Sequence, residues 1–216
     1  MSEPILKLTA GNLAALLCAR ICHDLVSPVG ALTAALEVFD DDDNIDMRDD
    51  AMELIRLSAG QASAKLQFLR LAFGAGGSAP GIVGTEELKR LTFGVYGSAK
   101  ATIDWQIKVD GLDKSAARLL LNLVMLAVMS VPRGGDIVVS ADVGAEKTSL
   151  KLVCTGPKAR LDIAVVSTLG GGAPELGFDG RSIQPFYTGM IARESGGEVT
   201  AVIDEETVTF AAHVCV

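Results

Sequence analysis

A run of four aspartates and an asparagine, at residues 40–44, separates two long stretches in which apolar residues recur every three or four positions. This spacing predicts helices over residues 10–39 and 47–73. The charged run between them is typical of the solvated tip of a helical hairpin. It also matches four ligand spacings of a calcium-binding EF-hand loop, but Met47 stands where that loop requires glycine, and the hairpin tip is therefore the favoured interpretation.

The first helix is predicted to bury one apolar stripe and to expose a histidine. His23 lies roughly 175° from the middle of the stripe on a helical wheel, and Asp24 follows it. Arg20, Ser27 and Gly30 share the histidine's side, so we expect an exposed imidazole with a cation one turn before it. The small residues would let another protein approach closely. The stripe comprises Leu17, Cys18, Ile21, Leu25, Val29, Leu32, Leu36 and Phe39.

The second helix carries two apolar stripes on roughly opposite sides, and the first helix can cover only one of them. A second copy of the hairpin would cover the other, which predicts a homodimer with a four-helix bundle across a two-fold axis. The alternative is that the second stripe packs on the C-terminal part of the chain. That stripe comprises Leu57, Ala64, Phe68 and Leu71.

The charge and the apolar runs exclude several classes of protein. A net charge of −8 argues against a nucleic-acid partner. The start shows no secretory signal, and the apolar run 119–131 is shorter than the ~20 residues that span a bilayer. We therefore expect a soluble, cytoplasmic protein with no membrane partner and reduced cysteines. Cys18 and Cys22 could form half a zinc site, but the sequence does not complete it, and no bound metal is expected.

A stretch rich in glycine at residues 74–81 has the composition of a linker, and it divides the chain into residues 1–75 and 82–216. After the linker, the patterns predict helices near 85–98, 114–131, 160–168 and 182–194. Strands are predicted at 102–109, 137–143, 149–154, 198–203 and 207–215. Mixed helices and mostly hairpin-linked strands indicate an α+β sandwich of helices on a sheet.

The segment around His23 resembles a known phosphoacceptor motif. His23-Asp24-Leu25-Val26-Ser27-Pro28 is similar to the His-Glu/Asp-Leu-x-Thr-Pro box of two-component histidine kinases. Pro28 falls inside the predicted helix and is expected to bend it without ending it.

The second part of the chain resembles the ATP-binding domain of those kinases, the Bergerat or GHKL fold. Asn122 to Ala127, followed by Pro132-Arg133-Gly134-Gly135, is similar to the kinase N box, but its second asparagine is Leu126 here. Val153 to Lys158 is similar to Val-x-Asp-Thr-Gly-x-Gly, with Cys154 in place of the aspartate that binds adenine. The segment 187–192 keeps one glycine of a phosphate-binding loop. Positions that shape the fold are kept, and those that would touch nucleotide are changed.

A kinase-like hairpin joined to a degenerate Bergerat domain resembles the ChpT family of bacterial histidine phosphotransferases. The resemblance implies that His23 takes a phosphoryl group from one response-regulator receiver domain and passes it to another. Asp24 would orient the imidazole or manage its proton, and Arg20 could contact the phosphoryl oxygens. Ser27 and Gly30 would form the docking floor, and Lys158 and Arg160 would form a second docking surface.

The resemblance also implies the partners. The donor would be the receiver of a hybrid kinase, and the acceptors would be regulators of the CtrA and CpdR kind. The receiver would bring its own magnesium, so no cofactor is expected in this chain. Two alternatives remain open: an ATP-dependent sensor kinase core with diverged loops, and a non-catalytic scaffold with a kinase-like binding domain.

Overall fold

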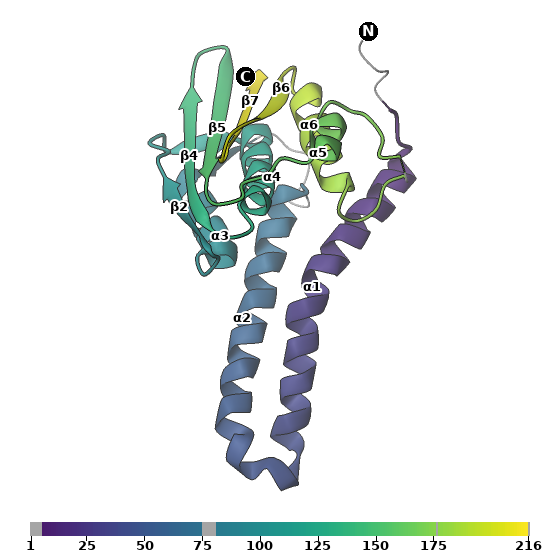
Figure 1. Ribbon diagram of the computed structural model, residues 1–216, viewed down its shortest axis with the longest axis vertical. Coiled ribbons are helices and arrows are strands. Elements are labelled where there is room, and N and C mark those ends of the chain that lie inside the picture. The colour runs from purple at the N-terminus through teal and green to yellow at the C-terminus, as the bar shows by residue number, and fades with distance from the viewer. Residues whose placement is uncertain (1–5, 75–80, 176, 216) are drawn as a thin grey trace.

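A long helical hairpin projects from an α/β part in the computed structural model, which describes residues 6–74, 81–175 and 177–215 (Figure 1). The hairpin consists of α1 (Ala10–Asp40), a 3-10 turn (Asp42–Met47) and α2 (Arg48–Ala72). Helix α1 continues through Pro28, as expected. The predicted linker at 74–81 lies mostly outside the described residues.

The acidic run forms the tip of the hairpin and is held by its own hydrogen bonds. An Oδ1 of Asp41 accepts from the backbone N–H of Asp43 at 2.9 Å. Arg48 donates to Asp42 at 2.9 Å. In the described ranges, no group of three or more acidic, histidine or cysteine side chains is arranged to hold a metal ion. The tip is therefore a self-capped turn.

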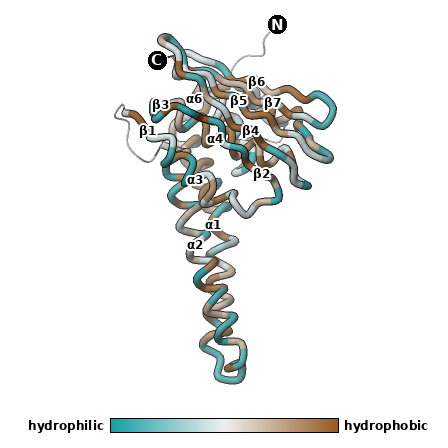
Figure 2. The backbone as a smooth tube through the Cα atoms, turned by 90° about the vertical axis from the view of Figure 1, so that its left-hand side faces the viewer, coloured by the Kyte–Doolittle hydropathy of each residue, from teal (hydrophilic) through white to brown (hydrophobic). Residues whose placement is uncertain are grey.

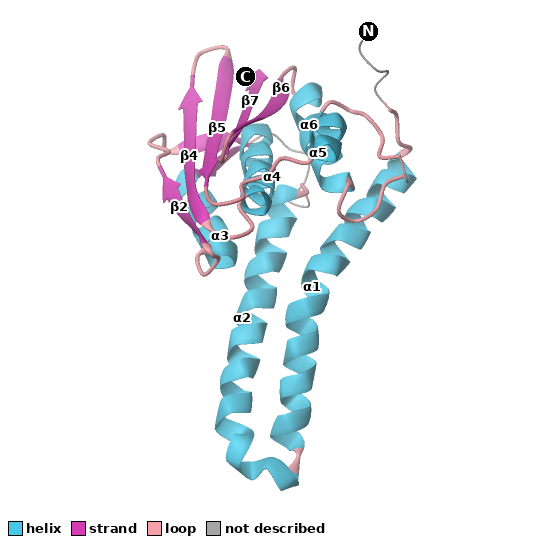
Figure 3. Ribbon diagram, viewed as in Figure 1, coloured by secondary structure: helices cyan, strands magenta, loops and turns pink. Residues whose placement is uncertain are grey.

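The rest of the chain is built on a mixed five-stranded sheet with helices packed on it, an α+β fold as predicted (Figure 3). The strand order is β2-β4-β5-β7-β6; β2 and β4 are parallel, and the other pairs are antiparallel. The strands of this sheet are β2 (Ala101–Trp105), β4 (Gly135–Val143), β5 (Lys147–Thr155), β6 (Glu198–Asp204) and β7 (Thr207–Cys215). A separate two-stranded sheet joins β1 (Ile82–Gly84) to β3 (Gly111–Asp113). The helices are α3 (Thr85–Tyr96), α4 (Lys114–Ser130), α5 (Ile163–Leu169) and α6 (Ile183–Glu194).

The core lies between the sheet and α4, which is buried along most of its length. On β5 and β7 the buried residues alternate with exposed or half-buried ones, because successive side chains of a strand point to opposite faces. The C-terminal end of α2 belongs to the same core. Phe68 is 1% exposed, and its ring meets that of Tyr96 edge-on with 5.6 Å between centroids. Asn122 donates to the carbonyl of Ala72 at 2.8 Å.

This packing decides between the two interpretations of the second stripe on α2. Phe68 is buried and Leu71 packs against the core, so this end of the stripe is covered within the chain. The alternative interpretation is correct for these two residues, and they are not available to a second hairpin. Leu57, nearer the tip, remains 57% exposed.

Helix α1 is rotated relative to the orientation that its apolar stripe predicted. Its buried residues are Arg20, Pro28 and Ala35, whereas Val29 and Leu36 of the stripe are 48% and 43% exposed. The facing residues buried on α2 are also small, Ala51 and Ser58 among them. Small side chains allow the two helix axes to approach closely. Several of the larger apolar residues, Val29 and Leu36 among them, are consequently left exposed on the hairpin. Apolar and polar residues are interspersed along both of its helices (Figure 2).

By length and composition alone, α1 is the one helix in the described part of the chain that could cross a membrane. Only 11% of its most apolar window is buried. The same composition also suits a helix whose apolar side meets another protein.

Candidate functional site

His23 stands exposed on α1 and is held by its neighbour. Its side chain is 52% exposed, and its Nδ1 lies 3.1 Å from Oδ1 of Asp24. Because a carboxylate only accepts hydrogen bonds, Nδ1 must be the donor in this contact. The neutral ring then carries its lone pair on Nε2, the nitrogen not engaged by Asp24. In this tautomer Nε2 is the ring nitrogen whose lone pair could act as a nucleophile.

Arg20 supports the carboxylate from the other side. Its Nε donates to Oδ2 of Asp24 at 2.9 Å, so the two oxygens of Asp24 serve two different partners. Arg20, Asp24 and His23 thus form a chain of contacts that runs from the interior to the surface. The contact with Arg20 fixes the orientation of the Asp24 carboxylate.

The predicted position of Arg20 on the exposed face is wrong. Arg20 is 8% exposed and lines a cavity of about 220 Å³ together with Asp24 and Tyr96. The physical reason is the rotation of α1, which turns this residue towards the second part of the chain. An arginine can be buried there because Asp24 satisfies its charge. In this structure Arg20 acts on Asp24 and not at the surface where a phosphoryl group would arrive.

Ser27 and Gly30 lie on the exposed side of α1, as predicted. A Cβ added at Gly30 would meet nothing within 4 Å, so the helix backbone is accessible at this point. Ser27 and Gly30 thus add little bulk to the exposed surface beside His23. Such a surface permits a partner's backbone to come near the imidazole.

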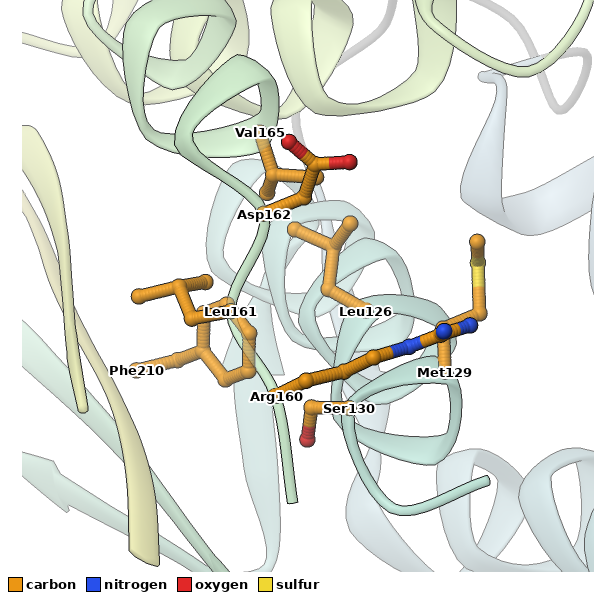
Figure 4. A pocket seen from close by; sticks show the side chains of 8 residues that line it. All are labelled: Leu126, Met129, Ser130, Arg160, Leu161, Asp162, Val165 and Phe210. Atoms are coloured by element: carbon orange, nitrogen blue, oxygen red, sulfur yellow. The ribbon is translucent and has the colours of Figure 1, made fainter. Parts of the chain in front are cut away.

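A cavity of about 450 Å³ lies between α4, α5 and β7, where the kinase resemblance places a nucleotide (Figure 4). Leu126, on α4, projects into it, and Leu126 is only 3% exposed. Cys154, the residue that replaces the adenine-binding aspartate, is 0% exposed. Burial raises the pKa of the Cys154 thiol to about 11, so the group is neutral at physiological pH. A leucine and a neutral thiol do not fit magnesium or an adenine amine.

The glycines kept from the kinase motifs have a structural role. A side chain at Gly156 would collide with the backbone of Gly134 and Gly135. The backbone N–H of Arg160 donates to the carbonyl of Ser130 at 2.9 Å, which ties the following loop to the end of α4. These close backbone approaches hold the loop after β5 against the end of α4 and the start of β4.

Lys158 and Arg160 are exposed on this loop, and Arg160 lines the cavity. Lys158 has a left-handed backbone, with φ of 59°, and its N–H donates to Glu206 at 3.2 Å. The Arg160 side chain extends along α4 towards Met129 (Figure 4). Met129 also lines the cavity under Asp24, so a single exposed methionine borders both the emptied pocket and the ion-pair cavity.

Sequence reasoning missed Lys65, which lies on α2 and lines the cavity under Asp24. Its Nζ donates to the backbone carbonyl of Asp24 at 3.1 Å. Nothing local in the sequence signals a contact between residues 41 positions apart. The other histidine, His213, lies in β7. It is opposite Ser149 of β5 on one side and Glu198 of β6 on the other, inside the sheet.

Comparisons with known proteins find relatives that match nearly the whole chain. A family model described as the histidine phosphotransferase C-terminal domain matches residues 85–207. The protein phosphotransferase ChpT of Brucella abortus (strain 2308) is 35% identical over 212 residues, which cover 98% of this chain and 100% of that protein.

Solved structures show the same relationship. A bacterial phosphotransferase superposes with a TM-score of 0.85 at 33% identity, covering 97% of this chain and 100% of that chain. The catalytic domain of the histidine kinase ThkA has a TM-score of 0.50 at 15% identity, covering 64% of this chain and 98% of that chain. The second likeness shows that the kinase catalytic fold is shared.

Proposed function

The chain belongs to the ChpT family of histidine phosphotransferases, and on that premise we propose that His23 is the residue that carries the phosphoryl group. The observation that carries this proposal is the contact between Nδ1 of His23 and Asp24, which leaves Nε2 free at an exposed, uncrowded position.

The transfer step follows from this geometry. The Nε2 lone pair of His23 attacks the phosphorus of an aspartyl phosphate, the bond from phosphorus to the aspartate oxygen breaks, and the carboxylate leaves. The imidazole keeps its proton on Nδ1 and becomes positively charged, and the adjacent Asp24 carboxylate stabilises that charge. In the second transfer an acceptor carboxylate attacks the same phosphorus, and neutral His23 leaves. Positioning and charge neutralisation supply most of the catalysis in such reactions.

The proposed partners are response-regulator receiver domains. The donor is the receiver of a hybrid kinase, and the acceptors are regulators of the CtrA and CpdR kind. The receiver brings the magnesium ion that neutralises the phosphoryl oxygens, and this chain contributes no cofactor. Ser27 and Gly30 form the floor on which the receiver's phosphorylation site docks. We assign phosphotransfer to residues 1–75. Partner binding is assigned both to residues 1–75 and to residues 82–216.

Lys158 and Arg160 are proposed as a second contact for the receiver. The chain has a net charge of −8, so its overall field repels an acidic partner, and attraction must come from local cations. Both side chains are exposed on the loop beside the cavity that the kinase resemblance assigns to nucleotide. A cavity that no longer suits ATP can serve as a surface for a protein partner.

We further propose that the protein acts as a cytoplasmic homodimer. Several large apolar side chains stay exposed on the hairpin, with Val26 at 68%, Leu57 at 57% and Leu54 at 43%. Pairing two hairpins as a four-helix bundle would cover such residues. The kinase alternative has less support, because Leu126 and Cys154 replace the residues that a nucleotide needs.

The direct test is incubation with a phosphorylated receiver, following the label onto this protein. Parent protein should acquire an acid-labile phosphoryl group, and His23→Ala should acquire none while keeping its circular dichroism spectrum. The His213→Ala variant is the matched control and should be labelled like the parent. Persistent labelling of folded His23→Ala would exclude His23, and binding of receivers without labelling of the parent would favour the scaffold alternative.

A further inference from the structure

Pro28 leaves a gap in the hydrogen bonding of α1 next to the phosphoacceptor histidine. In an α-helix the carbonyl of residue i accepts from the N–H of residue i+4. Residue 28 would therefore supply the donor for the carbonyl of Asp24, but proline has no N–H. Pro28 is buried in the hairpin, so water has little access to this side of the helix. An unpaired carbonyl in such a place is costly.

Lys65 fills that gap. Its Nζ donates to the carbonyl of Asp24 at 3.1 Å, from the neighbouring helix α2. The bond is partly buried and links the two helices at the residue that holds the imidazole of His23. A lysine has three donors and no acceptor, so its compact charge suits a lone carbonyl oxygen.

Asp24 is consequently fixed at both ends. Its carboxylate is held by Arg20 at 2.9 Å, and its main-chain carbonyl is held by Lys65. Arg20, Asp24 and Lys65 line the same cavity of about 220 Å³. The two cations approach one acidic residue from different elements, which restrains both its side chain and its backbone.

We propose that Lys65 is a positioning residue for phosphotransfer, which replaces the hydrogen bond lost at Pro28 and thereby fixes the backbone from which Asp24 orients His23. This inference rests on the proposed role of His23. Lys65 touches neither the imidazole nor the phosphoryl group in this arrangement. Its effect is on the tautomer and direction of the ring, because a displaced Asp24 would no longer hold the proton on Nδ1.

Lys65 is needed to pair the Asp24 carbonyl only while residue 28 is proline. In Pro28→Ala the alanine N–H can pair with the Asp24 carbonyl, so removal of the lysine should matter little there. A double-mutant cycle over Lys65→Met and Pro28→Ala therefore isolates the predicted relationship. The methionine keeps the length of the side chain and removes its donors. Lys65→Arg keeps a donor and should retain most of the activity.

The rate of transfer from a saturating phosphorylated receiver is the first measurement. We expect Lys65→Met to lower it by about tenfold, the effect of one charge-assisted hydrogen bond, with little change in receiver affinity. In the Pro28→Ala background the same change should cost less than about twofold. Arg56→Met removes an exposed cation earlier on α2 and serves as the matched control, with an unchanged rate. An equal loss in both backgrounds, or no loss in either, would overturn the proposal.

A second measurement does not depend on transfer. Nitrogen-15 NMR of the His23 ring reports which nitrogen carries the proton, and Lys65→Met should shift that balance away from Nδ1 while Arg56→Met should not. An unchanged tautomer in Lys65→Met would refute the positioning role even if transfer were slower. If His23→Ala were still phosphorylated, the proposed function would fail, but the NMR result would still decide how Lys65 acts on the ring.

Discussion

Arg20 and Asp24 form an ion pair one turn apart on α1, with 2.9 Å between the Nε of Arg20 and Oδ2 of Asp24. Both side chains are largely buried, at 10% and 18% exposure, although the histidine that they support is on the surface. The pair therefore connects the packed interior of the protein to the exposed His23 imidazole.

Replacing Arg20 by methionine should impair both stability and transfer. Asp24 would lose its charged partner in a partly buried site, and removal of one member of a buried pair costs roughly 3 kcal/mol. Urea unfolding should show this loss, and transfer at saturating receiver should fall because Asp24 no longer has a fixed orientation. Arg20→Lys keeps the charge and should recover part of both. If Arg20→Met transferred normally, the carboxylate would not depend on this support.

Charged substitutions near the tip of the hairpin should separate the proposed dimer. Leu54→Glu with Leu57→Glu alters two exposed side chains, so the monomer should stay folded while light scattering reports half the parent mass. Phe68→Glu is the contrasting control: it places a charge at a 1% exposed core position and should lower the melting temperature. A parent protein that is monomeric at high concentration would contradict the dimer.

Titration with ATP and magnesium should give no binding heat. The 3% exposed Leu126 offers no magnesium ligand, and the neutral, buried Cys154 cannot act as a carboxylate acceptor for the adenine amine. Incubation with labelled ATP should likewise leave His23 unphosphorylated. A true histidine kinase core run in parallel verifies that the assay detects binding. A micromolar dissociation constant would return the sensor kinase to first place among the candidate functions.

Reversing the two loop cations should slow association with the receiver. Lys158→Glu with Arg160→Glu should lower transfer at limiting receiver and low salt, because exposed charges mainly affect the association rate. At saturating receiver the rate should match that of the parent. Lys147→Glu with Lys151→Glu makes the same charge change at exposed positions of β5 and should have a much smaller effect. Equal rates for the two double variants would exclude the loop as a docking surface.

The local sequence was sufficient to predict the helices, most of the strands and the exposed histidine. Apolar spacing predicted α1, α2 and α4 within a few residues, because hydrophobic period and helical period coincide over long segments. It did not reveal β1 and β3, which have three residues each and are too short to show an alternating pattern. The family resemblance implied that Asp24 would orient the imidazole of His23, and the two side chains are in contact because the residues are neighbours in the sequence.

The rotation of α1 and the second support of Asp24 were decided only by tertiary structure. Apolar residues on α1 indicated a helix, but they could not show whether their stripe faces α2 or a different surface. Close packing selected the small residues for the hairpin interior and turned Arg20 inwards. Likewise, the pairing of Lys65 with the Asp24 carbonyl joins positions 41 residues apart. Periodicity describes one helix at a time, whereas these contacts depend on how two helices are placed against each other and against the core.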